Sequence, residues 1–123
     1  MIRTLLTSLV LAGMVAGAAL AQGSPVYCGS FTPFEIRANA AGKSADVRAS
    51  QAMDIINKYL GGKVGKVAVR PDGKNARLTL NGETVAVVTP ADASAEKQSS
   101  VMAVAQKWSR SLTKAFEESK AQK

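Results

Sequence analysis

The sequence predicts an α+β fold of the order β-α-β-β-β-α, in which one antiparallel sheet carries two helices packed on one face. Short runs that alternate apolar and polar residues predict the strands, because successive side chains of a strand point to opposite faces. Two longer stretches carry apolar residues at three- and four-residue steps, which is the spacing of an amphipathic helix. Asn81-Gly82, a strong hairpin signal, joins two of the strand runs and makes them antiparallel.

The first 21 residues have the pattern of a secretory signal peptide. One basic residue, Arg3, precedes an apolar run that closes with the small-residue site Ala19-Leu20-Ala21. The run is short for a membrane-spanning helix, which needs roughly 20 residues, so a membrane anchor is disfavoured. We therefore expect cleavage after Ala21, export to the periplasm or cell surface, and no transmembrane segment in the mature chain.

The mature chain divides into three parts by composition. Residues 22–33 are rich in Pro, Gly and Ser and are expected to form an N-terminal lead-in. Residues 34–118 carry the periodic patterns and form a single α+β domain, and residues 119–123 form a charged tail. This length suits one domain with a modest core.

The domain begins with an alternating run at residues 34–38, which predicts a half-buried strand. Ser44 is suited to cap the following helix, because its hydroxyl can accept a free N–H of the first turn. The apolar stripe of that helix runs to Leu60, and Gly61-Gly62 ends it, since glycine readily adopts the left-handed conformation of a helix end.

Three short strand runs follow, "KVAVR", "ARLTL" and "ETVAVVT", and predict an antiparallel meander. In the third run we expect Val85 and Val87 to point inward, with Ala86 and Val88 outward. Pro90 after Thr89, with Asp92 at the spacing of a capping box, predicts a turn that starts a helical segment. The last helix is expected over residues 99–118, with Trp108 in its core-facing stripe.

The chain is basic, with 16 Lys and Arg against 9 Asp and Glu and a net charge of +7. In an exported protein such charge favours an anionic envelope component or an acidic protein partner over nucleic acid. We expect contacts with such a partner on the sheet face that the helices leave uncovered, and as a second stripe on the last helix. The candidate binding residues are Arg37, Lys66, Arg70 and Arg77 on the sheet, and Lys107, Arg110 and Lys114 on the helix.

No catalytic site is predicted. The chain has no histidine, which excludes Ser-His and Cys-His pairs and histidine-bound zinc. The carboxylates are scattered, and "GGKVGK" lacks the spacing and Ser/Thr of a phosphate-binding loop. We therefore expect a binding protein without metal or cofactor, and an enzyme is disfavoured.

Cys28 is the single cysteine of the chain and lies in the predicted lead-in, outside the expected core. A lone cysteine in an exported protein is either a free thiol or half of an intermolecular disulfide. We expect Cys28 to tether a second copy or a partner, with a buried thiol as the alternative.

Three segments together resemble a known bacterial module: "SADVRASQAMDIINKYL", "ARLTLNGETVAVVTPADA" and "VMAVAQKWSRSLTKAF". They are similar to a small extracytoplasmic α/β module of envelope proteins, found in exported hypothetical proteins and before mechanosensitive-channel-type membrane domains. The resemblance covers most of residues 34–116 and implies an envelope location with an accessory or sensory role. Its motifs are structural, so it implies no catalytic residue.

These observations favour a non-enzymatic exported protein that acts as a binding or assembly subunit of a cell-envelope complex. One alternative is an exported sensory or regulatory module for a membrane partner. Another is a redox or copper protein that uses Cys28 with Met53 or Met102, because soft sulfur ligands suit Cu(I).

Overall fold

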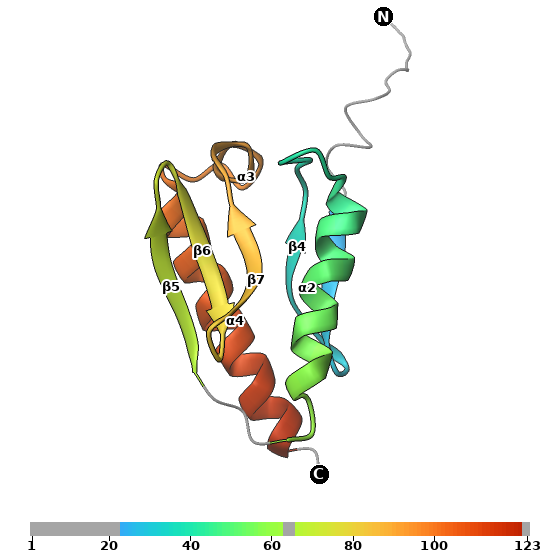
Figure 1. Cartoon of the computed structure of the whole chain (residues 1–123). Helices are drawn as coiled ribbons and strands as arrows, with labels where there is room; N and C mark the ends of the chain where they lie inside the picture. The colour runs from blue at the N-terminus through green and yellow to red at the C-terminus, as the bar shows by residue number, and fades with distance from the viewer. Residues whose placement is uncertain (1–22, 63–65, 122–123) are drawn as a thin grey trace, which may run out of the picture.

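The computed structural model describes residues 23–62 and 66–121 (Figure 1). The predicted signal peptide, residues 1–21, lies outside the described residues. The elements follow in the order β3 (Ser24–Cys28), β4 (Phe31–Ile36), α2 (Ala45–Tyr59), β5 (Val67–Asp72), β6 (Asn75–Leu80), β7 (Glu83–Val88), α3 (Pro90–Ala95) and α4 (Val101–Ala121). The fold is α+β with antiparallel strands, as predicted, and has one strand more than expected.

The additional strand is β3, which lies in the segment that we expected to be an irregular lead-in. β3 pairs antiparallel with β4 and places Val26 directly opposite Phe34. Gly29, with φ of +64°, lies in the connection between the strands. Pro25 is tolerated because β3 is an edge strand, where a missing N–H need not interrupt a ladder.

The strands form two sheets instead of the single sheet that was predicted. β3 and β4 make a two-stranded sheet, and β5, β6 and β7 make a three-stranded sheet in that order. In Figure 1, α4 lies behind the three-stranded sheet, while α2 lies in front of β3 and beside β4. α4 contacts strands of both sheets, and α2 contacts β3 and β7, so the helices join the sheets into one unit.

One hydrophobic core lies between these elements and draws residues from all of the strands and both long helices. Trp108 of α4 is 1% exposed and stacks on Phe34 of β4, with ring centroids 4.5 Å apart and planes inclined by 8°. This confirms that Trp108 belongs to the core. The stack connects α4 to the β3–β4 sheet.

The hairpin between β6 and β7 forms at the predicted residues, with positive φ at both Asn81 (53°) and Gly82 (84°). A register shift follows: Leu78 lies opposite Ala86, but Thr79 lies opposite Thr84, so Val85 is an extra residue in β7. Such a bulge reverses the inward and outward positions beyond it.

The bulge corrects one expectation for β7. Ala86 and Val88 are buried, although we expected them to point outward. Val87, expected to point inward, is only half-buried. The correction matters for the site described below, because it determines which β7 side chains face the core.

The helix caps agree with the sequence pattern. The hydroxyl of Ser44 accepts a hydrogen bond from the Val47 N–H at 3.2 Å, which caps α2. Thr89 and Asp92 form the predicted capping box at the start of α3. α4 begins two residues later than predicted and continues to Ala121, so part of the expected charged tail is helical. None of the described helices is both long and apolar enough to cross a membrane.

Candidate functional site

The outer face of the three-stranded sheet lies opposite α4 and carries a row of side chains that includes two arginines. Arg70 lies directly across from Arg77, and Arg77 lies directly across from Val87. Both arginines are exposed. Like charges at directly opposite positions repel each other, so this arrangement favours a negatively charged neighbour.

The negative charge near this pair comes from Asp72, whose Oδ2 lies 2.9 Å from Arg77 Nη2. Within residues 23–62 and 66–121, no carboxylate forms an ion pair with Arg70. Lys66 is also exposed and precedes β5, where its N–H donates to the Asn81 side-chain oxygen at 2.9 Å. Three of the four predicted sheet residues therefore belong to the same sheet.

Arg37 does not join them, and the expectation that all four converge is wrong. It follows β4 in the two-stranded sheet and lies on the side of α4. Its Nη1 is 2.5 Å from Glu96 Oε2, and its Nη2 is 3.1 Å from Glu35 Oε1. Sequence phase predicted convergence because it assumed one continuous sheet.

The candidate stripe on α4 is exposed as predicted, with Lys107, Arg110 and Lys114 all on the surface. Lys107 Nζ lies 3.0 Å from Glu96 Oε1, so Glu96 accepts from both Lys107 and Arg37. The Glu96 side chain is 5% exposed. Part of the positive charge on this side of the molecule is therefore balanced internally.

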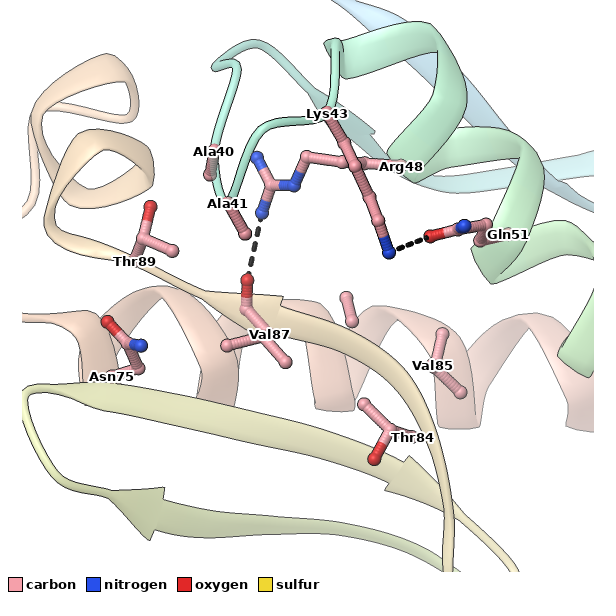
Figure 2. A pocket seen from close by; sticks show the side chains of 11 residues that line it. Ala40, Ala41, Lys43, Arg48, Gln51, Asn75, Thr84, Val85, Val87 and Thr89 are labelled. Atoms are coloured by element: carbon pink, nitrogen blue, oxygen red, sulfur yellow. Dashed lines mark hydrogen bonds between the residues drawn. The ribbon is translucent and has the colours of Figure 1, made fainter.

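A cavity of about 220 Å³ lies between β7 and α2 (Figure 2). Its upper wall is the loop 40–43 with Arg48 and Gln51 of α2, and its floor is residues 84–87 of β7. Lys43 extends over the opening, where its Nζ donates to Gln51 Oε1 at 3.1 Å. We call this cavity the α2–β7 groove.

Asn75, the first residue of β6, also lines the α2–β7 groove. Its side-chain oxygen is buried and has no hydrogen-bond partner, the one such side-chain atom in the described part of the chain. A buried polar atom without a partner is unfavourable, and in native structures it often indicates a ligand or an ordered water.

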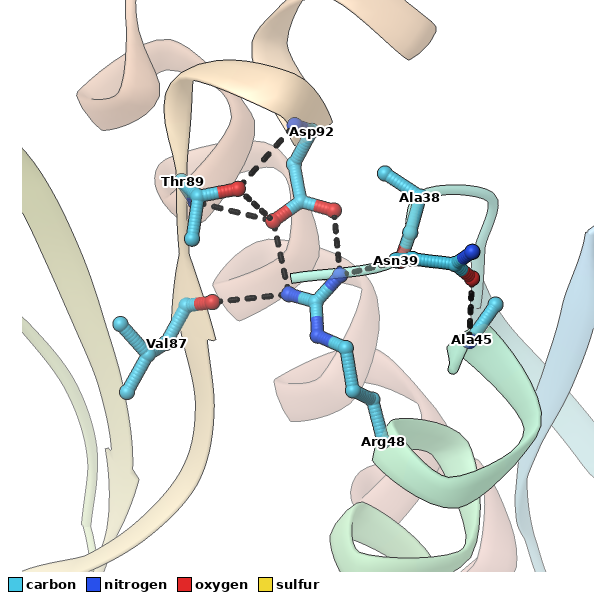
Figure 3. A network of polar contacts seen from close by, with 7 residues as sticks. All are labelled: Ala38, Asn39, Ala45, Arg48, Val87, Thr89 and Asp92. Atoms are coloured by element: carbon cyan, nitrogen blue, oxygen red, sulfur yellow. Dashed lines mark hydrogen bonds and ion pairs between the residues drawn. The ribbon is translucent and has the colours of Figure 1, made fainter. Parts of the chain in front are cut away.

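A buried ion pair closes one end of the groove (Figure 3). Arg48 Nη1 donates to Asp92 Oδ1 at 2.9 Å, and Arg48 Nη2 donates to Asp92 Oδ2 at 2.7 Å. The same guanidinium donates to the carbonyls of Ala38 at 2.6 Å and Val87 at 2.8 Å. The two side chains are 8% and 1% exposed, so the pair is removed from water.

Sequence reasoning missed this pair, although Asp92 was correctly assigned as a capping residue. Asp92 Oδ2 accepts from the Thr89 N–H at 2.8 Å as well as from Arg48. The available signal was the position of Arg48 on α2, because it lies three residues after Ala45 and four before Ala52, within the apolar stripe. A charged residue in that phase predicts a buried partner.

A second polar cluster connects the end of α2 to the start of β7. Lys58 Nζ donates to Glu83 Oε1 at 2.8 Å, and the Tyr59 hydroxyl donates to Glu83 Oε2. The hydrogen bonds from Lys58 and Tyr59 hold the pKa of Glu83 below its ordinary value. The hydrogen bond to Glu83 also raises the pKa of Lys58 and of Tyr59.

Cys28 is fully buried in β3, and the expectation that it lies outside the core is wrong. β3 alternates, so Val26 and Cys28 point inward while Tyr27 is 49% exposed. Burial raises the pKa of the Cys28 thiol to about 11. This opposes both a disulfide tether and thiolate ligation of copper, because each requires an accessible thiolate.

Comparison with known proteins finds a family match and no named relative. The family described as "Domain of unknown function (DUF8459)" matches residues 25–119, which includes every described strand except the first residue of β3. No curated protein and no solved structure matches the chain. Because the match covers most of the sequence, this chain belongs to the DUF8459 family.

Proposed function

We propose that this protein is a non-enzymatic binding or assembly subunit exported to the cell envelope, and that it holds an anionic partner on the outer face of the three-stranded sheet. The observation that carries this proposal is the exposed Arg70–Arg77 pair, which has a single carboxylate beside it. A partner carboxylate or phosphate would relieve the repulsion of the pair. The net charge of +7 supports attraction of the same sign over longer distances.

The envelope location is supported by the signal-peptide pattern and by the resemblance of three segments to extracytoplasmic modules. N-terminal sequencing of the native protein is expected to start at Gln22. An intact Met1 in a cytosolic fraction would contradict export and, with it, an envelope partner.

Binding is tested by pull-down from detergent-solubilised native envelope. The double change Arg70→Gln/Arg77→Gln is expected to lose most of the retained partner at low salt, and retention by the unchanged protein should fall as salt rises. Arg110→Gln/Lys114→Gln removes equal charge from α4 and serves as the matched control. Both pairs are exposed, so each substitution should shift stability by less than about 0.5 kcal/mol.

The identity and the charge dependence of the retained protein decide the outcome. A surface-layer or pore component supports an assembly subunit, whereas a channel or sensor supports the regulatory alternative. Equal retention by the Arg70→Gln/Arg77→Gln protein and the unchanged protein would show that the outer face is not the binding surface.

A further inference from the structure

We infer that the α2–β7 groove binds an extended acidic peptide segment along the outer edge of β7. This inference rests on the proposed binding function and specifies the chemistry of the partner. Three independent features of the groove lead to it: an unpaired strand edge, a small open volume, and a polar lining with excess positive charge.

The first feature is the strand edge. β7 pairs with β6 on one side, and among the described strands none pairs with its other side. An edge strand presents N–H and C=O groups that an added strand can bond. Arg48 already occupies the Val87 carbonyl at 2.8 Å, which leaves the Thr84–Val85 part of the edge facing the groove.

The second feature is size. Small-molecule pockets typically enclose about 300–1,000 Å³. The α2–β7 groove encloses about 220 Å³ and is open to solvent. A volume of this size fits a short stretch of a longer ligand better than it fits a complete small molecule. An extended peptide enters such a groove with part of its length and continues on the surface beyond it.

The third feature is the polar lining. The charge of Arg48 is balanced by Asp92, so the free positive charge at the groove belongs to Lys43, which bonds to the neutral Gln51. Arg77 adds a cation on the same face, because it lies directly opposite Val87. These positions favour a carboxylate on the ligand. The Asn75 oxygen lacks a donor, and a peptide N–H is such a donor.

Fluorescence anisotropy with the purified mature protein tests this inference. The probe is a fluorescein-labelled decapeptide of alternating Thr and Glu, a pattern that favours extended backbone and places carboxylates on one side. The comparison probes are the alternating Thr-Gln decapeptide and a Thr-Glu decapeptide with N-methylated Thr residues. We expect the first probe to bind about tenfold or more tightly than either comparison probe, because one lacks the charge and the other lacks N–H donors.

The matched variants are Lys43→Glu at the groove and Lys114→Glu on α4, which make the same change in charge. Lys43→Glu is expected to weaken binding about tenfold, while Lys114→Glu changes it less than about twofold. Thr84→Trp should abolish binding by filling the groove, with an unfolding midpoint measured to confirm that the variant is folded. Hydrogen exchange at Thr84 and Val85 should slow when the probe is bound.

Equal weakening by Lys43→Glu and Lys114→Glu would assign binding to general charge and overturn the groove. Displacement of the probe by phosphatidylglycerol vesicles that themselves require Lys43 would assign the groove to lipid and overturn the peptide. If the probe fails to bind while Arg70→Gln/Arg77→Gln still loses the native partner, this inference fails and the proposed function stands.

Discussion

The buried pair of Arg48 and Asp92 provides the strongest stability prediction. Arg48→Met removes the cation while leaving a side chain of similar length, and it deletes the bidentate bonds to Asp92 and the bonds to the Ala38 and Val87 carbonyls. Asp92 is then a carboxylate at 1% exposure without its counter-charge. Breaking one partner of a buried pair typically costs about 3–5 kcal/mol. Against a typical total stability of about 5–15 kcal/mol, this is a large loss.

The double change separates the pair from the helix cap. Asp92→Asn keeps a side-chain oxygen that can accept the Thr89 N–H, so it removes the charge without removing the cap. We expect Asp92→Asn to destabilise on its own, because Arg48 is left as a buried cation. Neutral replacement of both partners is often tolerated. Arg48→Met/Asp92→Asn should therefore lose less than the sum of the single changes, by about 2–3 kcal/mol.

The assay is urea unfolding at pH 7, followed by the fluorescence of Trp108. Arg77→Met is the matched control, because its ion pair with Asp72 has side chains 46% and 44% exposed. An exposed pair of this kind contributes about 0–1 kcal/mol. If Arg48→Met loses no more stability than Arg77→Met, or if the double change is additive, the pair does not stabilise the fold as described. Arg48→Lys retains the charge and provides a milder variant for comparison if Arg48→Met does not fold.

Two further predictions concern titrating groups. Because burial raises the pKa of Cys28 to about 11, iodoacetamide should label the thiol only after denaturation; the raised value also means that its stability contribution is complete below the ordinary thiol pKa and is lost as pH rises through about 11. Rapid labelling of the folded protein would place the thiol at the surface. Lys58→Met should raise the pKa of Glu83, measured by carboxyl NMR, because the ammonium hydrogen bond is the main cause that lowers it. A lowered carboxyl pKa contributes stability above the ordinary Glu value that is lost as pH falls through the folded value, so Lys58→Met should flatten the acid limb of the unfolding profile, and an unchanged limb would contradict the assignment.

Features that are encoded within a few neighbouring residues were predictable from the sequence. The Ser44 cap, the Thr89–Asp92 capping box and the Asn81-Gly82 turn each depend on local backbone geometry, and all three form as expected. The stripe that placed Trp108 in the core was equally clear, because helical periodicity needs no knowledge of the partner element.

Features that depend on pairing between distant residues were not predictable in this way. β3 was missed because Pro25 and Gly29 suggest irregular backbone, and its pairing with β4 is visible only in three dimensions. The bulge at Val85 was missed because residues 85–88 are all apolar, and a period of two has no phase in such a run. The misplacement of Arg37 followed from assuming that one sheet, and not two, carries the strands.

The same missed features give the α2–β7 groove its shape. The bulge at Val85 turns Ala86 and Val88 into the core, which leaves small or short side chains along the β7 floor. Arg48 covers the Val87 carbonyl and so ends the accessible edge on that side. Bulges and covering groups at sheet edges normally prevent unwanted strand pairing. Here they limit it to the stretch beside Lys43 and Thr84, so an added strand has one position along β7 and a register fixed by its carboxylate.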